Sequence, residues 1–184
     1  IIVLIVSGSF FSGNTFYDSP LSNPLDTVTV IKPGNNYEIE NQLITSILTR
    51  YHFKEFEIND SLSISIFNRY LGSLDNGKNY FLQSDIESFN SEKYNLDDKL
   101  FKGDVQFYYE VFNVYLKRLN ERTSYVDELL DVEFDYSVDE NYEFDRDKSD
   151  WAKNQSELNE IWRKRLKNDA LTYKLNGKDW EFIQ

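Results

Sequence analysis

The sequence predicts an all-α fold, an irregular multi-helix domain of about five helices preceded by an extended leader. Two observations lead to this fold class. Between residue 38 and Gln184, apolar residues recur at spacings of three and four in several segments, which is the period of an amphipathic helix. All three prolines lie between Asn14 and Tyr37, in a stretch that has no sustained period and is typical of a leader or linker.

The first residues predict an export signal rather than part of the domain. Residues 1–13 have a short apolar run followed by small residues, as at the end of a secretory signal peptide, and the run is too short to span a bilayer. A buried β-strand is the alternative, because the run is β-branched. We therefore expect a signal-peptide remnant at 1–13, a linker at 14–37 and a helical domain at 38–184. Because residue 1 is not methionine, we expect translation to begin upstream.

Two helices are expected next. From Ile39 to Phe53 one apolar stripe predicts a core-facing helix; its members are Ile39, Leu43, Ile44, Ile47, Leu48 and Tyr51. Asn59 and Asp60 are candidate caps for a second helix. That helix has a common apolar face made by Leu62, Ile66, Phe67, Tyr70 and Leu71, although its alternating start could also form a strand.

The stretch from Asn68 to Phe89 is rich in polar residues and lies between apolar segments. Asn76 and Gly77 predict a turn, and Ser84 with Glu87 predicts a capping box for the next helix. Asp75 or Asp85 could instead act as a base, but no nucleophile with a His or Lys partner lies at supporting spacing. We interpret the stretch as a helix-turn-helix connection.

A long helix is expected from Asp104, its cap, to Asp131. Its apolar positions are Val105, Tyr108, Tyr109, Phe112, Tyr115, Leu116, Leu119, Val126, Leu129 and Leu130. Residues 131–150 are dense in acids and predict a loop, in which a short extended pair is an alternative left open. Neither Asp135 nor Asp139 starts an EF-hand pattern, so only an irregular calcium site stays open there.

The last long helix is expected to open at Asn154. Leu158, Ile161, Trp162 and Leu166 would point inward, with Leu171 as a further candidate. Arg163, Lys164, Arg165 and Lys167 would point mostly outward, as an ion-paired solvated face. A further capped segment begins after Gly177. Because the chain stops there, we expect a piece of a larger protein.

Composition excludes several function classes. The formal net charge of -12 and the pI of 4.5 argue against nucleic acid as a partner. The absence of cysteine excludes disulfides and thiolate sites, and the single histidine, His52, is expected to be structural. The 32 acids offer no pair that stands out as a hydrolase dyad. The sequence thus predicts no catalytic, cofactor-binding or metal-binding residue.

Two phrases in this sequence carry a family resemblance. The first comprises Arg69, Tyr70, Leu71, Leu74, Asp75, Tyr80, Phe81, Leu82, Ser84, Asp85, Ile86 and Phe89, and the second comprises Arg146, Trp151, Leu158 and Trp162. With the segment between them, they resemble the N-terminal region of the tail-specific (carboxy-terminal processing) proteases of the bacterial envelope. The resemblance covers about residues 38–184.

The resemblance implies a non-catalytic N-terminal domain of an exported serine endopeptidase, located in the periplasm or cell envelope. In that family a PDZ domain captures the apolar C-terminal tails of protein substrates and a Ser-Lys dyad cleaves them; both would lie beyond Gln184. The helical domain would be a scaffold, help to enclose substrate or dock an adaptor protein. The alternatives are a free-standing, secreted, acidic interaction module and a small carboxylate-based hydrolase.

Overall fold

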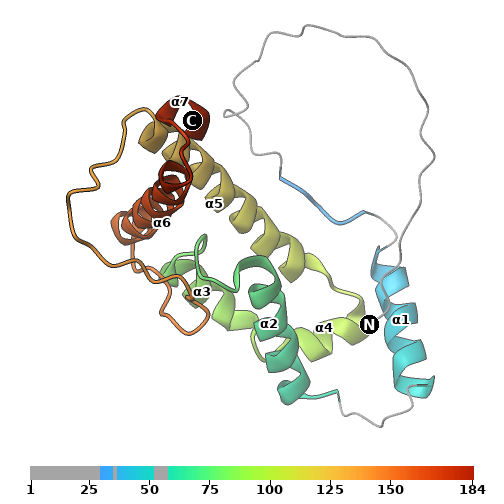
Figure 1. Cartoon of the computed structure of the whole chain (residues 1–184). Coiled ribbons are helices and arrows are strands. Elements are labelled where there is room, and N and C mark those ends of the chain that lie inside the picture. Colours follow the sequence, from blue (N-terminus) through green and yellow to red (C-terminus); the bar gives the residue numbers. More distant parts are fainter. Residues whose placement is uncertain (1–29, 35–36, 52–57) are drawn as a thin grey trace, which may run out of the picture.

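The computed structural model describes residues 30–34, 37–51 and 58–184, and these residues form an all-α fold, as the sequence predicts (Figure 1). The only bridge between extended residues in this part of the chain is a parallel one between Leu82 and Ala152. The helices are α1 (Tyr37–Tyr51), α2 (Asp60–Asp75), α3 (Gln83–Phe89), a 3₁₀ turn (Asn90–Glu92), α4 (Leu96–Lys102), α5 (Gln106–Leu130), α6 (Gln155–Leu175) and α7 (Trp180–Ile183).

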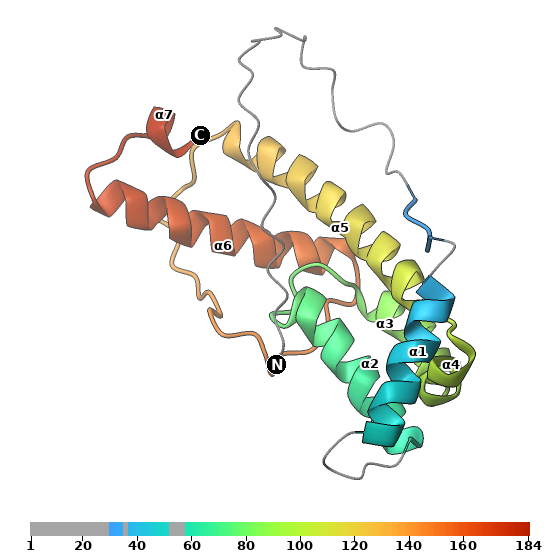
Figure 2. The ribbon, with the colours of Figure 1, turned by 90° about the vertical axis from the view of Figure 1, so that its right-hand side faces the viewer.

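The long helices α5 and α6 lie side by side and run in the same direction, joined by the loop 131–154 (Figure 2). α2, α3 and α4 gather at the N-terminal half of α5, and α1 lies outside them against α4. No helix in the described ranges is long and apolar enough to cross a membrane.

The main core lies where α2, α3, α4 and α5 meet. Its buried members are Phe67, Leu71, Phe81, Ile86, Phe89, Leu96, Phe107 and Val111. The aromatic rings pack edge to face as well as stacked: Phe81 meets Phe89 with centroids 5.6 Å apart, and Phe67 stacks on Phe107 at 5.8 Å. A smaller cluster of Leu82, Ala152 and Leu158, with Ile161 and Trp162 against it, joins the start of α6 to this core.

Helix ends follow the sequence in several places. Asn59 caps α2 and Asn154 caps α6, each accepting backbone N–H groups of the first turn. Asp104 Oδ1 accepts the N–H of Gln106, as a cap would, although the N-cap residue of α5 is Val105, one residue later than expected. The short helix α4 was not expected; it ends at Gly103, whose φ of 73° suits a glycine.

The prediction that the first helix faces the core is wrong for the apolar residues that can be assessed. Ile39, Leu43, Ile44 and Ile47 are 67%, 60%, 55% and 48% exposed. The opposite, more polar side of α1 packs on α4, where Thr45 is buried and Gln42 Nε2 donates to the carbonyl oxygen of Lys102 at 2.9 Å. The side chains of Leu48 and Tyr51, and His52, lie outside the described residues.

Candidate functional site

The turn between α2 and α3 is built around one buried carboxylate. Asp75 is 4% exposed, and its two oxygens accept the backbone N–H groups of Asn79 at 2.7 Å, Tyr80 at 2.9 Å and Phe81 at 3.0 Å. Hydrogen bonds to an ionised acceptor are among the stronger ones in proteins. Asp75 therefore fixes the path of the chain into α3 and is fully engaged as a structural acceptor.

The turn itself forms at Asn76 and Gly77, as predicted. The residue with positive φ is the next one, Lys78, at 51°. A Cβ on Gly77 would meet only the Asn79 side chain, whose Nδ2 lies 2.5 Å away and can swing aside, so neither space nor a left-handed backbone requires glycine here.

Asp85 ties the start of α3 to α5. Its carboxylate receives two parallel bonds from Arg118, Nε to Oδ2 and Nη2 to Oδ1, both 2.9 Å, and Oδ2 also accepts the N–H of Leu82 at 2.9 Å. Arg118 Nη1 binds Glu121 at 2.8 Å, and these bonds, the one to Asp85 first, raise the pKa of Arg118. Asp85 thus takes the reciprocal bonding role expected of the Ser84–Glu87 box, and that prediction is wrong because α3 begins at Gln83.

The second phrase packs onto the first. Trp162 Nε1 donates to the carbonyl oxygen of Asn79 at 2.6 Å, and its ring lies 5.6 Å from that of Tyr80. The ring of Trp151 lies 6.0 Å from that of Phe81. The N–H of Gln83 donates to the carbonyl oxygen of Ala152 at 2.8 Å.

We call this assembly the helix junction: Asp75, Asp85, Arg118, Trp151, Trp162 and the turn 76–82. It brings together both family phrases, which are more than 50 positions apart in the sequence. Asp75 and Asp85, the two candidate bases, serve here as acceptors for backbone and guanidinium groups. The geometry of the junction supports a positioning role for these carboxylates.

The loop 131–154 is anchored to α6 by a second ionic group. Glu140 accepts bonds from Arg163 and Lys167, and these bonds, the one from Arg163 first, lower its pKa to about 2. Lys167 Nζ also donates to the carbonyl oxygen of Val138 at 3.2 Å, and the side chain is buried. The expectation that Lys167 points into solvent is therefore wrong, because the loop folds over it.

The acids of this loop do not converge on a cation site. Within the ranges that the structure describes, no group of three or more His, Cys, Asp or Glu side chains could hold a metal ion. Several of the acids instead bond to neighbours in the loop, as Asp135 does to Ser137 and Glu143 does to Ser149.

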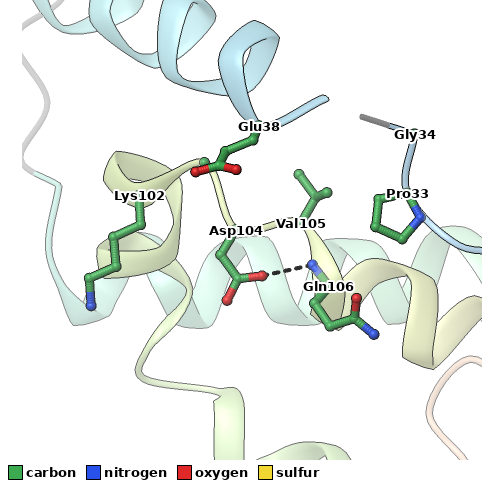
Figure 3. A pocket seen from close by; sticks show the side chains of 8 residues that line it. Pro33, Gly34, Glu38, Lys102, Asp104, Val105 and Gln106 are labelled. Atoms are coloured by element: carbon green, nitrogen blue, oxygen red, sulfur yellow. Dashed lines mark hydrogen bonds between the residues drawn. The ribbon is translucent and has the colours of Figure 1, made fainter. Parts of the chain in front are cut away.

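A hollow of about 540 Å³ lies between the residues before α1 and the start of α5 (Figure 3). It is lined by Pro33, Gly34, Glu38, Lys102, Gly103, Asp104, Val105 and Gln106. Figure 3 shows the Asp104 carboxylate turned to the backbone of Gln106, its bonded partner. The lining offers backbone contacts to a ligand and the charged side chains of Glu38, Lys102 and Asp104.

Comparison with known proteins identifies relatives of this domain. The family described as "Tail specific protease N-terminal domain" matches residues 44–184, which include the whole helix junction. The tail-specific protease of Haemophilus influenzae is 33% identical over 171 residues, 92% of this chain. The match covers 24% of that relative, so the chain spans about a quarter of its length.

Proposed function

The chain belongs to the family of tail-specific protease N-terminal domains, and we propose that it is a non-catalytic scaffold within an exported serine endopeptidase. The longer protein would cleave proteins recognised by apolar C-terminal tails, in the periplasm or cell envelope. A PDZ domain and a Ser-Lys dyad beyond Gln184 would supply capture and chemistry. In such a dyad a desolvated lysine with a lowered pKa serves as the base for the serine hydroxyl.

The scaffold role rests on one observation, which is that residues of the two family phrases contact one another and the rest of the domain. Their acidic and indole groups make contacts inside the domain: Asp75 to turn amides, Asp85 to Arg118 and Trp162 to Asn79. Such contacts fix the angle between α2, α3, α5 and α6. A domain of fixed shape can help to enclose a substrate or dock an adaptor protein beside a separate catalytic centre.

Cleavage assays test whether the peptidase activity belongs to the longer protein and not to this chain alone. The longer protein should hydrolyse an unstructured protein that ends in apolar residues and spare the same protein with a charged tail. The 184-residue chain alone should cleave neither. Turnover by the chain alone would contradict a non-catalytic role and favour a hydrolase in its own right.

The scaffold role has a separate test in the longer protein. Trp162→Ala removes the indole bond to Asn79 and loosens the junction. We expect kcat/KM to fall several-fold for the tailed protein and to change less than twofold for a short peptide, because only the larger substrate reaches the helical domain. Equal losses for both substrates would argue against a scaffold.

The exposed face of α1 favours the alternative function, a free-standing interaction module. That alternative predicts that the gene encodes no peptidase.

A further inference from the structure

Four aliphatic side chains on α1 form an exposed surface that no other described part of the domain covers. We call Ile39, Leu43, Ile44 and Ile47 the α1 stripe; they are 67%, 60%, 55% and 48% exposed. Their spacing places them on one side of the helix. α1 lies at the right-hand edge of the helices in Figure 1 and nearest the viewer in Figure 2, and it packs on α4.

The contacts of α1 with α4 hold the stripe outward. Gln42 Nε2 donates to the Lys102 carbonyl oxygen, Thr45 is buried against α4, and the backbone oxygen of Glu38 lies 2.5 Å from where a Cβ on Gly103 would be. Rotating α1 to bury the stripe would break these contacts. An amphipathic helix that is fixed with its apolar side outward is typical of a surface with a partner.

We propose that the α1 stripe is a docking surface for another part of the same longer protein, the part outside this chain. The proposal rests on the proposed function. The match covers 24% of the length of the H. influenzae relative, so most of that protein lies outside the matched region. In the longer protein to which this chain would belong, the corresponding region could cover the α1 stripe.

Surface area favours a tethered domain over a second copy. Four aliphatic side chains carry on the order of 400 Å² of apolar surface. Each partner in a standard stable interface buries roughly 800 Å². A small surface suffices when the two parts belong to one chain, because the tether supplies a high effective concentration.

Cysteine labelling in the longer protein tests this proposal. The chain has no cysteine, so Leu43→Cys places a single thiol on the stripe, and Thr49→Cys places a matched thiol on the same helix outside it. Mass spectrometry of the digested protein identifies the labelled site. We expect the thiol at position 43 to react with a maleimide at least tenfold more slowly than the thiol at position 49. Ile44→Cys, with the same expectation, replaces Leu43→Cys if that variant loses helix content by circular dichroism.

Three outcomes would overturn the proposal. Equal labelling at positions 43 and 49 would show that the stripe is open in the longer protein. If the slow labelling at position 43 became fast when the protein was diluted to a monomer, a second copy of the protein would be what covers the stripe. Protection that appears only when an adaptor protein is added would assign it to a separate partner. The labelling needs no peptidase activity, so failure of the proposed function would be seen separately in the cleavage assay.

Discussion

Asp75 is the side chain on which the turn between α2 and α3 depends most. Asp75→Ala removes the acceptor of three backbone N–H groups and leaves them inside a packed turn. Hydrogen bonds to a charged group contribute roughly 1.5–3 kcal/mol each, with incomplete additivity, so we expect a loss of about 3 kcal/mol or more in the free energy of unfolding. Urea unfolding followed by circular dichroism measures it.

Two further variants make the Asp75 prediction specific. Asp75→Asn keeps one acceptor oxygen and should lose about 1–2 kcal/mol. Asp98→Asn, at an exposed position of α4, should change stability by less than about 0.5 kcal/mol. If Asp75→Ala were as mild as Asp98→Asn, the carboxylate would not be holding the turn.

Glu140 gives the loop 131–154 a pH-dependent anchor. Its pKa falls from 4.5 to about 2 in the folded protein because Arg163 and Lys167 bond to its charged form. A lowered folded-state pKa stabilises the fold above the unfolded-state value, and that stabilisation is lost as the pH falls through the folded-state value. The stability difference between the wild type and Glu140→Gln should therefore be full above about pH 4.5 and shrink towards pH 2.

Thermal unfolding across that pH range measures the Glu140 effect. Glu128→Gln, at an exposed position of α5, is the control and should show no comparable trend. A Glu140→Gln difference that stays constant from pH 6 to pH 2 would contradict the assigned ion pair.

At the level of helices, local signals in the sequence were sufficient to predict that most of the helices form and where several of them begin. Asn59, Asn154 and Asp179 each accept N–H groups of the helix that follows, as capping chemistry predicts. The loop between α5 and α6 also follows from its missing period. These features depend on residues close together in the chain.

The direction in which each helix faces could not be obtained in the same way. In α5 the fully buried positions include Phe107 and Val111, one position to the side of the expected stripe, because α2 and α3 approach from there. Lys167 is buried because a loop more than 20 residues earlier folds over it. In α1 the apolar side is exposed, because the more polar side packs on α4. The helix junction likewise depends on pairings such as Asp85 with Arg118, which no local pattern contains.

Alanine substitutions at two glycines distinguish the cost of backbone strain from the cost of a clash with α1. Gly103 and Gly177 have φ of 73° and 79°, so an alanine at either position costs about 1–2 kcal/mol. Only at Gly103 would the new Cβ meet the backbone, the Glu38 oxygen at 2.5 Å, whereas nothing lies within 4 Å at Gly177. We expect Gly103→Ala to be the more destabilising by roughly a further 1–3 kcal/mol.

Urea unfolding of the two glycine variants tests this difference. Gly103→Ala should also speed amide exchange in α1, because the shift needed to relieve the contact moves that helix. Equal losses for the two variants would mean that the contact between Glu38 and Gly103 is loose.

In the whole molecule, the packing divides the described chain into a firm part and an attached helix. The main core and the smaller cluster meet at Leu82, Ala152 and the indole of Trp162, so α2 to α6 share one continuous set of contacts. α1 packs mainly on α4, with Thr45 as its buried side chain among those described. We infer two levels of stability within one domain.

Amide hydrogen exchange measures these levels directly. Local opening has a lower free energy where few apolar side chains are buried, so peptides from α1 should exchange roughly tenfold faster or more than peptides from α2 and α5 in the 184-residue chain. If the α1 stripe is covered in the longer protein, the same peptides should slow there while those of α2 and α5 change little. Exchange of α1 together with α5 in the short chain, at one common rate, would contradict the division. In that case the contact with α4 would hold α1 as firmly as the core holds α5 in the short chain.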